Sequence, residues 1–86
     1  MSKYYVNYGT GTGNEWVEGT LDEVMAIADN GATYTQADIK IMDENDNLIA
    51  IRRWWGVKFD PEVSGCSEDE IISFGDFGYY DAWVII

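Results

Sequence analysis

The sequence has no histidine, one cysteine, one proline and only five lysine or arginine residues in 86 positions. Without histidine the commonest general base is missing, and the single Cys66 excludes an intrachain disulfide and a zinc site built on paired cysteines. No apolar run approaches the roughly 18 residues of a membrane-spanning helix, and the first residues lack the apolar core of a signal peptide. From these absences we expect a cytoplasmic protein with no metal, no cofactor and no membrane contact.

Acidic residues, in contrast, are abundant. Sixteen Asp and Glu give a formal net charge of −11, and a surface of this charge repels nucleic acid and anionic lipid and attracts basic proteins. The basic residues gather only at Arg52, Arg53 and Lys58, beside Trp54 and Trp55. Seven acids and no bases lie between positions 60 and 81. We expect these acids to neutralise the basic group within the fold, and we therefore expect no direct binding of nucleic acid.

The composition is that of a folded protein. Hydrophobic residues make up 47% of the chain and aromatic residues 15%, whereas disordered acidic chains are poor in both. The length allows one domain, residues 1–86. Large aromatic side chains supply the buried area that lets a short chain without disulfides fold.

Alternating apolar and polar residues predict strands along most of the chain. Gly-rich and Asp/Asn-rich segments between them predict turns. The last strand is apolar, and we expect it to be buried in the sheet or against a partner. The expected strands cover residues 3–8, 15–18, 39–43, 48–55, 71–74 and 82–86.

One helix is predicted over residues 21–30. Thr20 and Glu23 form a capping box at its start, and Gly31 is expected to end it in the left-handed conformation. A helix this short is unstable alone, so its apolar stripe must pack on an apolar surface. The stripe consists of Leu21, Val24, Met25 and Ala28, and the opposite side, expected in solvent, consists of Asp22, Ala26 and Asp29.

Together these elements predict the α+β class. We expect a small, mostly antiparallel sheet of four or five strands with the short helix packed on one face, in the order ββαβββ(β). A small open barrel with the helix closing one end is the alternative arrangement.

Three short motifs are similar to functional sites but lack their essential parts. The segment 9–13, GTGTG, has no lysine of a phosphate-binding loop, so we expect a hairpin loop. Residues 43–47 begin like a calcium-binding loop, yet Leu48 and Trp54 stand where glycine and glutamate are required. Residues 76–78 match the metal-binding motif of kinases without any other kinase element. We expect all three segments to be turns.

The sequence therefore offers a candidate partner-binding surface rather than a catalytic centre. The cores of such surfaces are enriched in tryptophan and tyrosine. The competing interpretation is that the aromatic residues simply form the core. The candidate residues are Trp54, Trp55, Glu68, Asp69, Glu70, Asp76, Tyr79, Tyr80 and Asp81.

The leading functional hypothesis is a non-enzymatic, protein-binding module whose acidic surface docks a basic partner. A short, acidic, aromatic-rich chain also resembles accessory proteins of phages and mobile elements, some of which mimic the charge of DNA. That resemblance implies an inhibitor of a DNA-binding protein as an alternative. Two further alternatives are a small carboxylate-based enzyme or ligand binder with an aromatic pocket, and a structural component that pairs through its C-terminal strand. We expect a monomer or a weak homo-oligomer.

Overall fold

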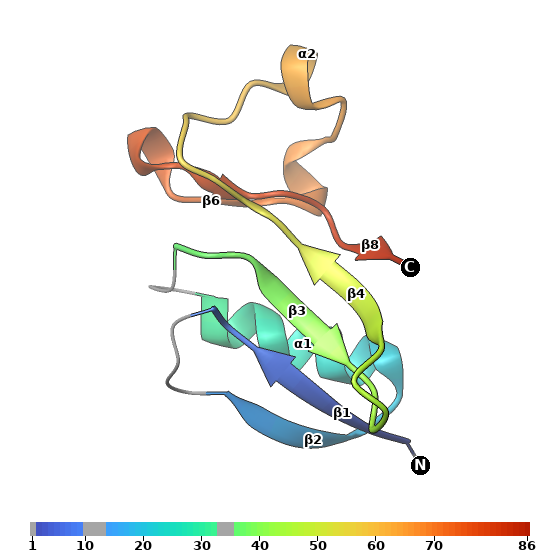
Figure 1. Ribbon diagram of the computed structural model, residues 1–86. Coiled ribbons are helices and arrows are strands. Elements are labelled where there is room, and N and C mark those ends of the chain that lie inside the picture. Colours follow the sequence, from blue (N-terminus) through green and yellow to red (C-terminus); the bar gives the residue numbers. More distant parts are fainter. Residues whose placement is uncertain (1, 10–13, 33–35) are drawn as a thin grey trace.

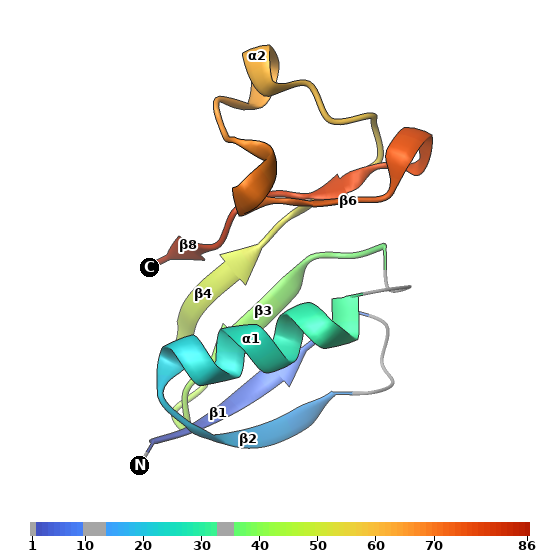
Figure 2. The same cartoon turned by 180° about the vertical axis from the view of Figure 1, so that it is seen from behind.

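The computed structural model describes residues 2–9, 14–32 and 36–86. Its larger part is an antiparallel sheet of five strands in the spatial order β2-β1-β3-β4-β8. Helix α1 (Leu21–Gly31) lies across one face of this sheet, and no described helix covers the other face (Figures 1 and 2). The predicted α+β class is confirmed, and the sheet is open rather than closed into a barrel. The strands are β1 (Ser2–Asn7), β2 (Glu15–Gly19), β3 (Ile39–Met42), β4 (Leu48–Arg52) and β8 (Val84–Ile85).

Helix α1 begins with the predicted capping box. The Thr20 hydroxyl accepts a hydrogen bond from the Glu23 backbone N–H, and the Glu23 carboxylate accepts one from the Thr20 N–H. These bonds satisfy two backbone groups at the helix end and hold the pKa of Glu23 below its usual range, because the bonds favour the charged form. Val24 and Ala28 are fully buried, as the predicted stripe requires.

The end of α1 differs from the prediction. Gly31 is the last helical residue, and Ala32 caps the helix with right-handed backbone angles, so the expected left-handed Gly31 is wrong. A Cβ atom at position 31 would lie 2.5 Å from the Tyr8 hydroxyl oxygen and 2.7 Å or less from its ring. Glycine is therefore required here by the close approach of Tyr8, which directly follows β1, and not by a turn.

The core lies between α1 and the sheet. Val6 of β1 and Ile39 and Ile41 of β3 are fully buried, and Ala50 of β4 lies opposite Ile41. The antiparallel pairing of β1 with β2 places the predicted hairpin correctly, although its Gly-rich loop, residues 10–13, lies outside the described residues. The side chains that face α1 thus come from alternate positions of the strands, as a sheet with one covered face requires.

The predicted long strand 48–55 is broken at Arg53. Strand β4 ends at Arg52, and the next two residues form β5 (Trp54–Trp55) in a second, three-stranded sheet that the sequence did not predict. The Trp54 N–H donates to the Asp38 carboxylate at 2.8 Å, and the Asp81 N–H donates to the Arg53 carbonyl at 2.8 Å. The second sheet has the order β5-β7-β6, with β6 (Ile72–Ser73) and β7 (Tyr79–Tyr80).

A buried cation of β4 joins the five-stranded sheet to α1 and to the turn at Glu70. Arg52 is 5% exposed, and its guanidinium lies 3.4 Å from the Asp29 carboxylate and donates to the Glu70 carbonyl at 3.2 Å. The Trp83 indole N–H donates to the same carboxylate at 2.9 Å, and the Arg52 Cζ lies 5.7 Å from the centroid of the Trp83 ring. The guanidinium thus lies over the ring of a tryptophan from the C-terminal segment. Asp29, expected in solvent, is a half-buried partner of Arg52.

The C-terminal segment forms a shorter strand than predicted. Of residues 82–86, only Val84 and Ile85 form β8, at one edge of the five-stranded sheet. The side chains of Val84, Ile85 and Ile86 are exposed rather than buried in the sheet. Among the described residues, no helix has the length and apolar character needed to cross a membrane.

Candidate functional site: the acidic end

The second sheet and its connections form one end of an elongated molecule measuring 37 × 24 × 18 Å (Figure 1). We call this part, residues 54–81, the acidic end. Besides β5, β6 and β7 it contains three helical turns, which are α2 (Pro61–Ser64), η2 (Glu68–Glu70) and η3 (Gly75–Phe77). Its seven carboxylates are those of Asp60, Glu62, Glu68, Asp69, Glu70, Asp76 and Asp81.

Short turns hold these carboxylates on the outside. Asp60 caps α2, because its carboxylate accepts a hydrogen bond from the Glu62 N–H at 3.0 Å, and Pro61 occupies the first helical position, where no N–H is needed. In η2, Glu68, Asp69 and Glu70 follow one another in a 3₁₀ turn. Such a turn has three residues per turn, so the three side chains point in different directions around it.

Aromatic rings form the interior of this end. Trp54 packs against Tyr80 with ring centroids 4.9 Å apart and against Phe74 at 5.8 Å, and Phe59 packs against Tyr79 at 5.1 Å. Tyr79 and Tyr80 are buried and Trp54 is half-buried. These three predicted site residues therefore serve the packing of the acidic end, as the competing interpretation held.

The loop between β6 and β7 fits closely over this aromatic interior. Gly78 has a φ of 144°, and a Cβ atom there would overlap the carbonyl oxygen of Trp55 and the ring of Trp54. The segment 76–78 is thus a tight turn, in agreement with the sequence, and its glycine allows the backbone to approach the tryptophans.

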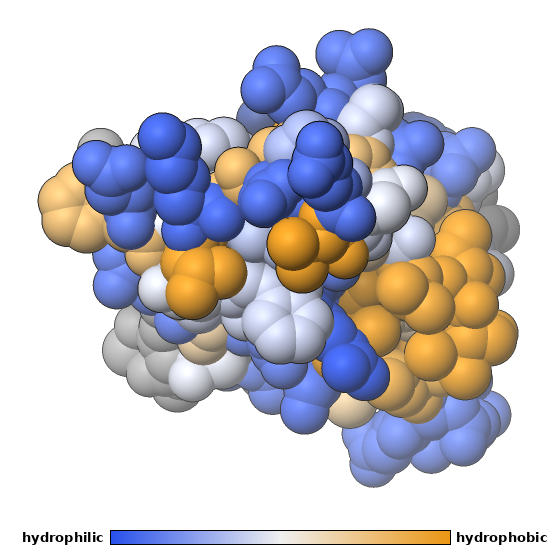
Figure 3. Space-filling model, turned by 90° about the horizontal axis from the view of Figure 1, so that it is seen from above, coloured by the Kyte–Doolittle hydropathy of each residue, from blue (hydrophilic) through white to orange (hydrophobic). Residues whose placement is uncertain are grey.

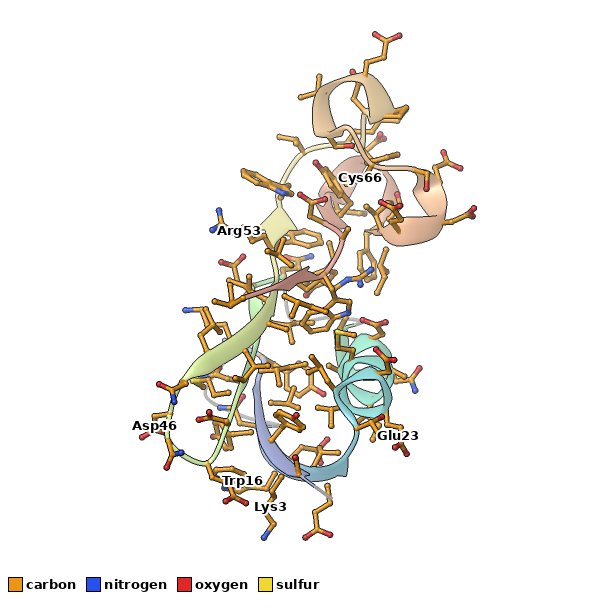
Figure 4. The ribbon with its side chains drawn as sticks, turned by 90° about the vertical axis from the view of Figure 1, so that its right-hand side faces the viewer. Lys3, Trp16, Glu23, Asp46, Arg53 and Cys66 are labelled. Carbon is orange, nitrogen blue, oxygen red and sulfur yellow. The ribbon has the colours of Figure 1, made fainter. Side chains whose placement is uncertain are left out.

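Asp81 is the one acid of this end with several bonded partners. Its carboxylate accepts hydrogen bonds from the Trp55 indole N–H at 3.1 Å, from its neighbour Ala82 at 2.8 Å and from the Cys66 thiol at 3.4 Å. Burial raises the pKa of Cys66, and the bond to the Asp81 carboxylate raises it further. Cys66 is therefore held as a neutral thiol, which is the wrong form for a nucleophile. Figure 4 labels it within the acidic end.

The remaining acids lie in solvent, and little positive charge compensates their negative charge. Glu68, Asp69, Glu70 and Asp76 are exposed, as are Asp60 and Glu62, which the sequence-based list of site residues omitted. Among the described residues, the acidic end contains a single ion pair, between Lys58 and Asp76, at 4.0 Å and largely in solvent. Such a pair contributes little stability. The acidic end therefore carries an uncompensated negative charge.

Exposed apolar side chains stand among these acids. Trp55 is 44% exposed although its indole N–H is bonded, and Val57, Val63 and Phe77 are more exposed still. Figure 3, which looks onto this end, shows separate hydrophobic areas surrounded by hydrophilic ones. Sequence reasoning missed Val63 and Phe77, although each is a single apolar residue within a polar, acidic or Gly-rich loop and could have been noticed for that reason.

Metal-ligating side chains are not clustered at the acidic end, all of whose residues are described. Within residues 2–9, 14–32 and 36–86, no three side chains of the metal-ligating types are gathered around one point. A pocket of about 430 Å³ lies at the opposite end of the molecule and is open to solvent; it is lined by Ser2, Lys3, Tyr4, Asp43, Glu44 and Ile49. Hydrogen bonds from the backbone of Asn47 and Asn45 lower the pKa of Asp43, so this carboxylate is held charged and is unsuited to donate a proton.

Comparisons with protein families, curated proteins and solved structures found no match to this chain.

Proposed function

We propose that this protein is a non-enzymatic binding module whose acidic end docks a basic surface of another protein. The observation that carries the proposal is the gathering of seven carboxylates, six of them exposed, at one end of the molecule, in a segment that has no lysine or arginine between positions 60 and 81. Their mutual repulsion is relieved when a cationic surface approaches, and their long-range field speeds the encounter.

The exposed apolar residues supply binding affinity that the charged residues alone do not provide. Charged rims mainly set the association rate and the partner preference, whereas buried aromatic contacts supply most of the affinity. Trp55 and Phe77 are the aromatic side chains of the acidic end that are exposed enough to be buried by a partner. We therefore assign steering to the acids and apolar contact to these two rings.

A mimic of DNA charge requires carboxylates in a row at the spacing of phosphates. The three consecutive acids of η2 instead point around a 3₁₀ turn. A carboxylate enzyme or ligand binder requires a buried acid in an aromatic pocket, and the pocket at the other end is lined by exposed or half-buried residues instead. Neither alternative is favoured by a specific observation.

The test compares two triple variants with the same change in charge. The tagged protein is used to capture partners from a lysate of its native host, and recovered proteins are identified by mass spectrometry at low and high salt. The first variant removes the acids of η2, and the second removes three exposed acids elsewhere. The first variant is Glu68→Gln, Asp69→Asn and Glu70→Gln, and the matched control is Asp22→Asn, Glu44→Gln and Asp46→Asn.

We expect basic proteins to be recovered by the native protein and by the control, and to be lost by the η2 variant or by added salt. For a purified partner, the η2 variant should weaken binding by about tenfold or more at low salt, equivalent to ~1.4 kcal/mol. Equal recovery by all three proteins, or recovery unaffected by salt, contradicts the proposal.

A further inference from the structure

The strand β8 leaves one edge of the five-stranded sheet open. It pairs only with β4, and its outer side has no strand among the described residues. Val84, Ile85 and Ile86 are 52%, 60% and 71% exposed. In Figure 3 a continuous hydrophobic area covers the right-hand side, which is the side on which Figure 1 shows β8 and the C-terminus. An apolar edge of this kind is a template for pairing with another strand.

The backbone of this edge presents a free pair of hydrogen-bonding groups. The Ile86 N–H donates to the Ile49 carbonyl at 2.8 Å, so residue 86 faces β4, and Val84 lies opposite Ile51 in the same ladder. Because alternate residues of a strand direct their N–H and C=O groups to opposite sides, those of Ile85 point away from β4. Ile85 therefore offers one donor and one acceptor at the open edge.

Charged side chains protect the β2 edge of the sheet from pairing with another strand, and the β8 edge has no such protection. Strand β2 carries Glu15 and Glu18 on its exposed length, and charged residues of this kind prevent two edges from pairing. Residues 82–86 contain no charged side chain and no proline. The Trp83 side chain is held by its bond to Asp29, which fixes the start of β8 against the fold.

We propose that β8 pairs antiparallel with β8 of a second copy of this chain, so that the two sheets continue into one another across a two-fold axis at Ile85. The pairing is self-complementary, because the two Ile85 residues exchange both of their outward hydrogen bonds and each Val84 lies opposite an Ile86. An edge whose side chains are all uncharged favours a second copy over a basic partner, since no acidic side chain at this edge attracts a cation. Two molecules of net charge −11 also repel each other least where they meet through residues without charged side chains.

The short contact predicts weak association, and the net charge fixes its response to salt. Only three residues of each copy meet, far fewer than in an interface of standard size, so we expect a dissociation constant on the order of 100 μM. Added salt screens the repulsion between two anions, so the dimer should become tighter as salt rises. Docking of a basic partner at the acidic end responds in the opposite direction, which separates this inference from the proposed function.

The experiment is sedimentation equilibrium of the full chain from about 10 μM to about 1 mM, at roughly 0.05 M and 0.5 M sodium chloride. Ile85→Pro removes the outward N–H without removing a ladder bond to β4, and Ile85→Lys places a charge at the edge. Val63→Lys makes the same change in charge at an exposed apolar residue of the acidic end and is the matched control. Circular dichroism checks that each variant keeps its secondary structure.

We expect the native protein and Val63→Lys to be in a monomer–dimer equilibrium whose dissociation constant falls as salt is added. Both Ile85 variants should have a dissociation constant at least about tenfold higher. Folded Ile85 variants that dimerise normally overturn the assignment to β8. A native protein that is monomeric at every concentration overturns the dimer, whatever the variants do. A dimer that weakens with added salt also overturns it, because such a dimer is held by opposite charges.

Discussion

Removing Asp29 should destabilise this protein more than removing its partner Arg52. Arg52 is 5% exposed, whereas 37% of the Asp29 side chain is in solvent. In an Asp29→Ala variant the guanidinium stays buried and loses its counter-charge, while the Trp83 indole N–H loses its acceptor. In an Arg52→Met variant the carboxylate that remains can still be hydrated and still accepts the bond from Trp83.

The magnitudes follow from this asymmetry. Leaving a buried charge without its partner costs about 3–5 kcal/mol. The Nε atom of Arg52 is already buried without a hydrogen-bond partner among the described residues, so without Asp29 the guanidinium keeps only its bond to the Glu70 carbonyl, the Trp83 ring and the charge of Asp81. Arg52→Met loses a partly exposed ion pair, the stacking on Trp83 and one bond to the Glu70 carbonyl, together about 2 kcal/mol. A chain of this length has a total stability of roughly 4–13 kcal/mol, so either loss is readily measured.

Urea unfolding followed by tryptophan fluorescence measures both variants. We expect Asp29→Ala to lose about 2 kcal/mol more than Arg52→Met, and to melt about 8–16 °C lower. Asp22→Ala is the matched control, since it removes an exposed aspartate from the same helix, and should change the free energy of unfolding by less than about 1 kcal/mol. An Arg52→Met variant that is as unstable as Asp29→Ala, or more so, refutes the reasoning from exposure.

Three further predictions concern single sites. Gly31→Ala should destabilise by about 1–3 kcal/mol in thermal unfolding, although alanine favours helices, because its Cβ would meet the Tyr8 ring; a more stable variant would show that the ring moves aside. Thr20→Ala should cost about 1 kcal/mol in the same measurement through loss of the capping box, and no change would mean that the cap is dispensable. Because its pKa is raised, Cys66 should react with iodoacetamide more slowly in the folded protein than in the unfolded chain at pH 8–9, since a smaller fraction of the folded thiol is deprotonated. Asp81→Asn should lower that pKa and speed alkylation, and an unchanged rate would contradict the role given to the Asp81 carboxylate.

The elements that were predictable depend on residues close together in the chain. The capping box of α1 needs only Thr20 and Glu23, three positions apart. The turn at residues 43–47 needs only Asp43, whose carboxylate accepts bonds from the N–H groups of Asn45 and Asn47. Because these contacts are local, the residues that make them are visible in the sequence, and the class of the fold followed from the order of such elements.

For the candidate site, the sequence predicted the exposed acids but not the burial of the aromatic residues. The acids of η2 and Asp76 are exposed as a polar loop suggests, but Tyr79 and Tyr80 are buried in the aromatic interior. A tyrosine in an interface and a tyrosine in a core look the same in sequence, because both places favour large rings with a polar tip. Only the packing of Trp54 on Tyr80 distinguishes the two.

By itself, the sequence determined a small acidic α+β protein, because composition, alternation and helix capping are properties of neighbouring residues. The tertiary structure alone decided where the long strand breaks, since the bonds of Trp54 to Asp38 and of Asp81 to Arg53 join residues far apart in the chain. It also decided that Asp29 faces a buried arginine and that the apolar β8 is left at an open edge. These outcomes depend on which segments meet in space, and a pattern of neighbouring residues does not contain that information.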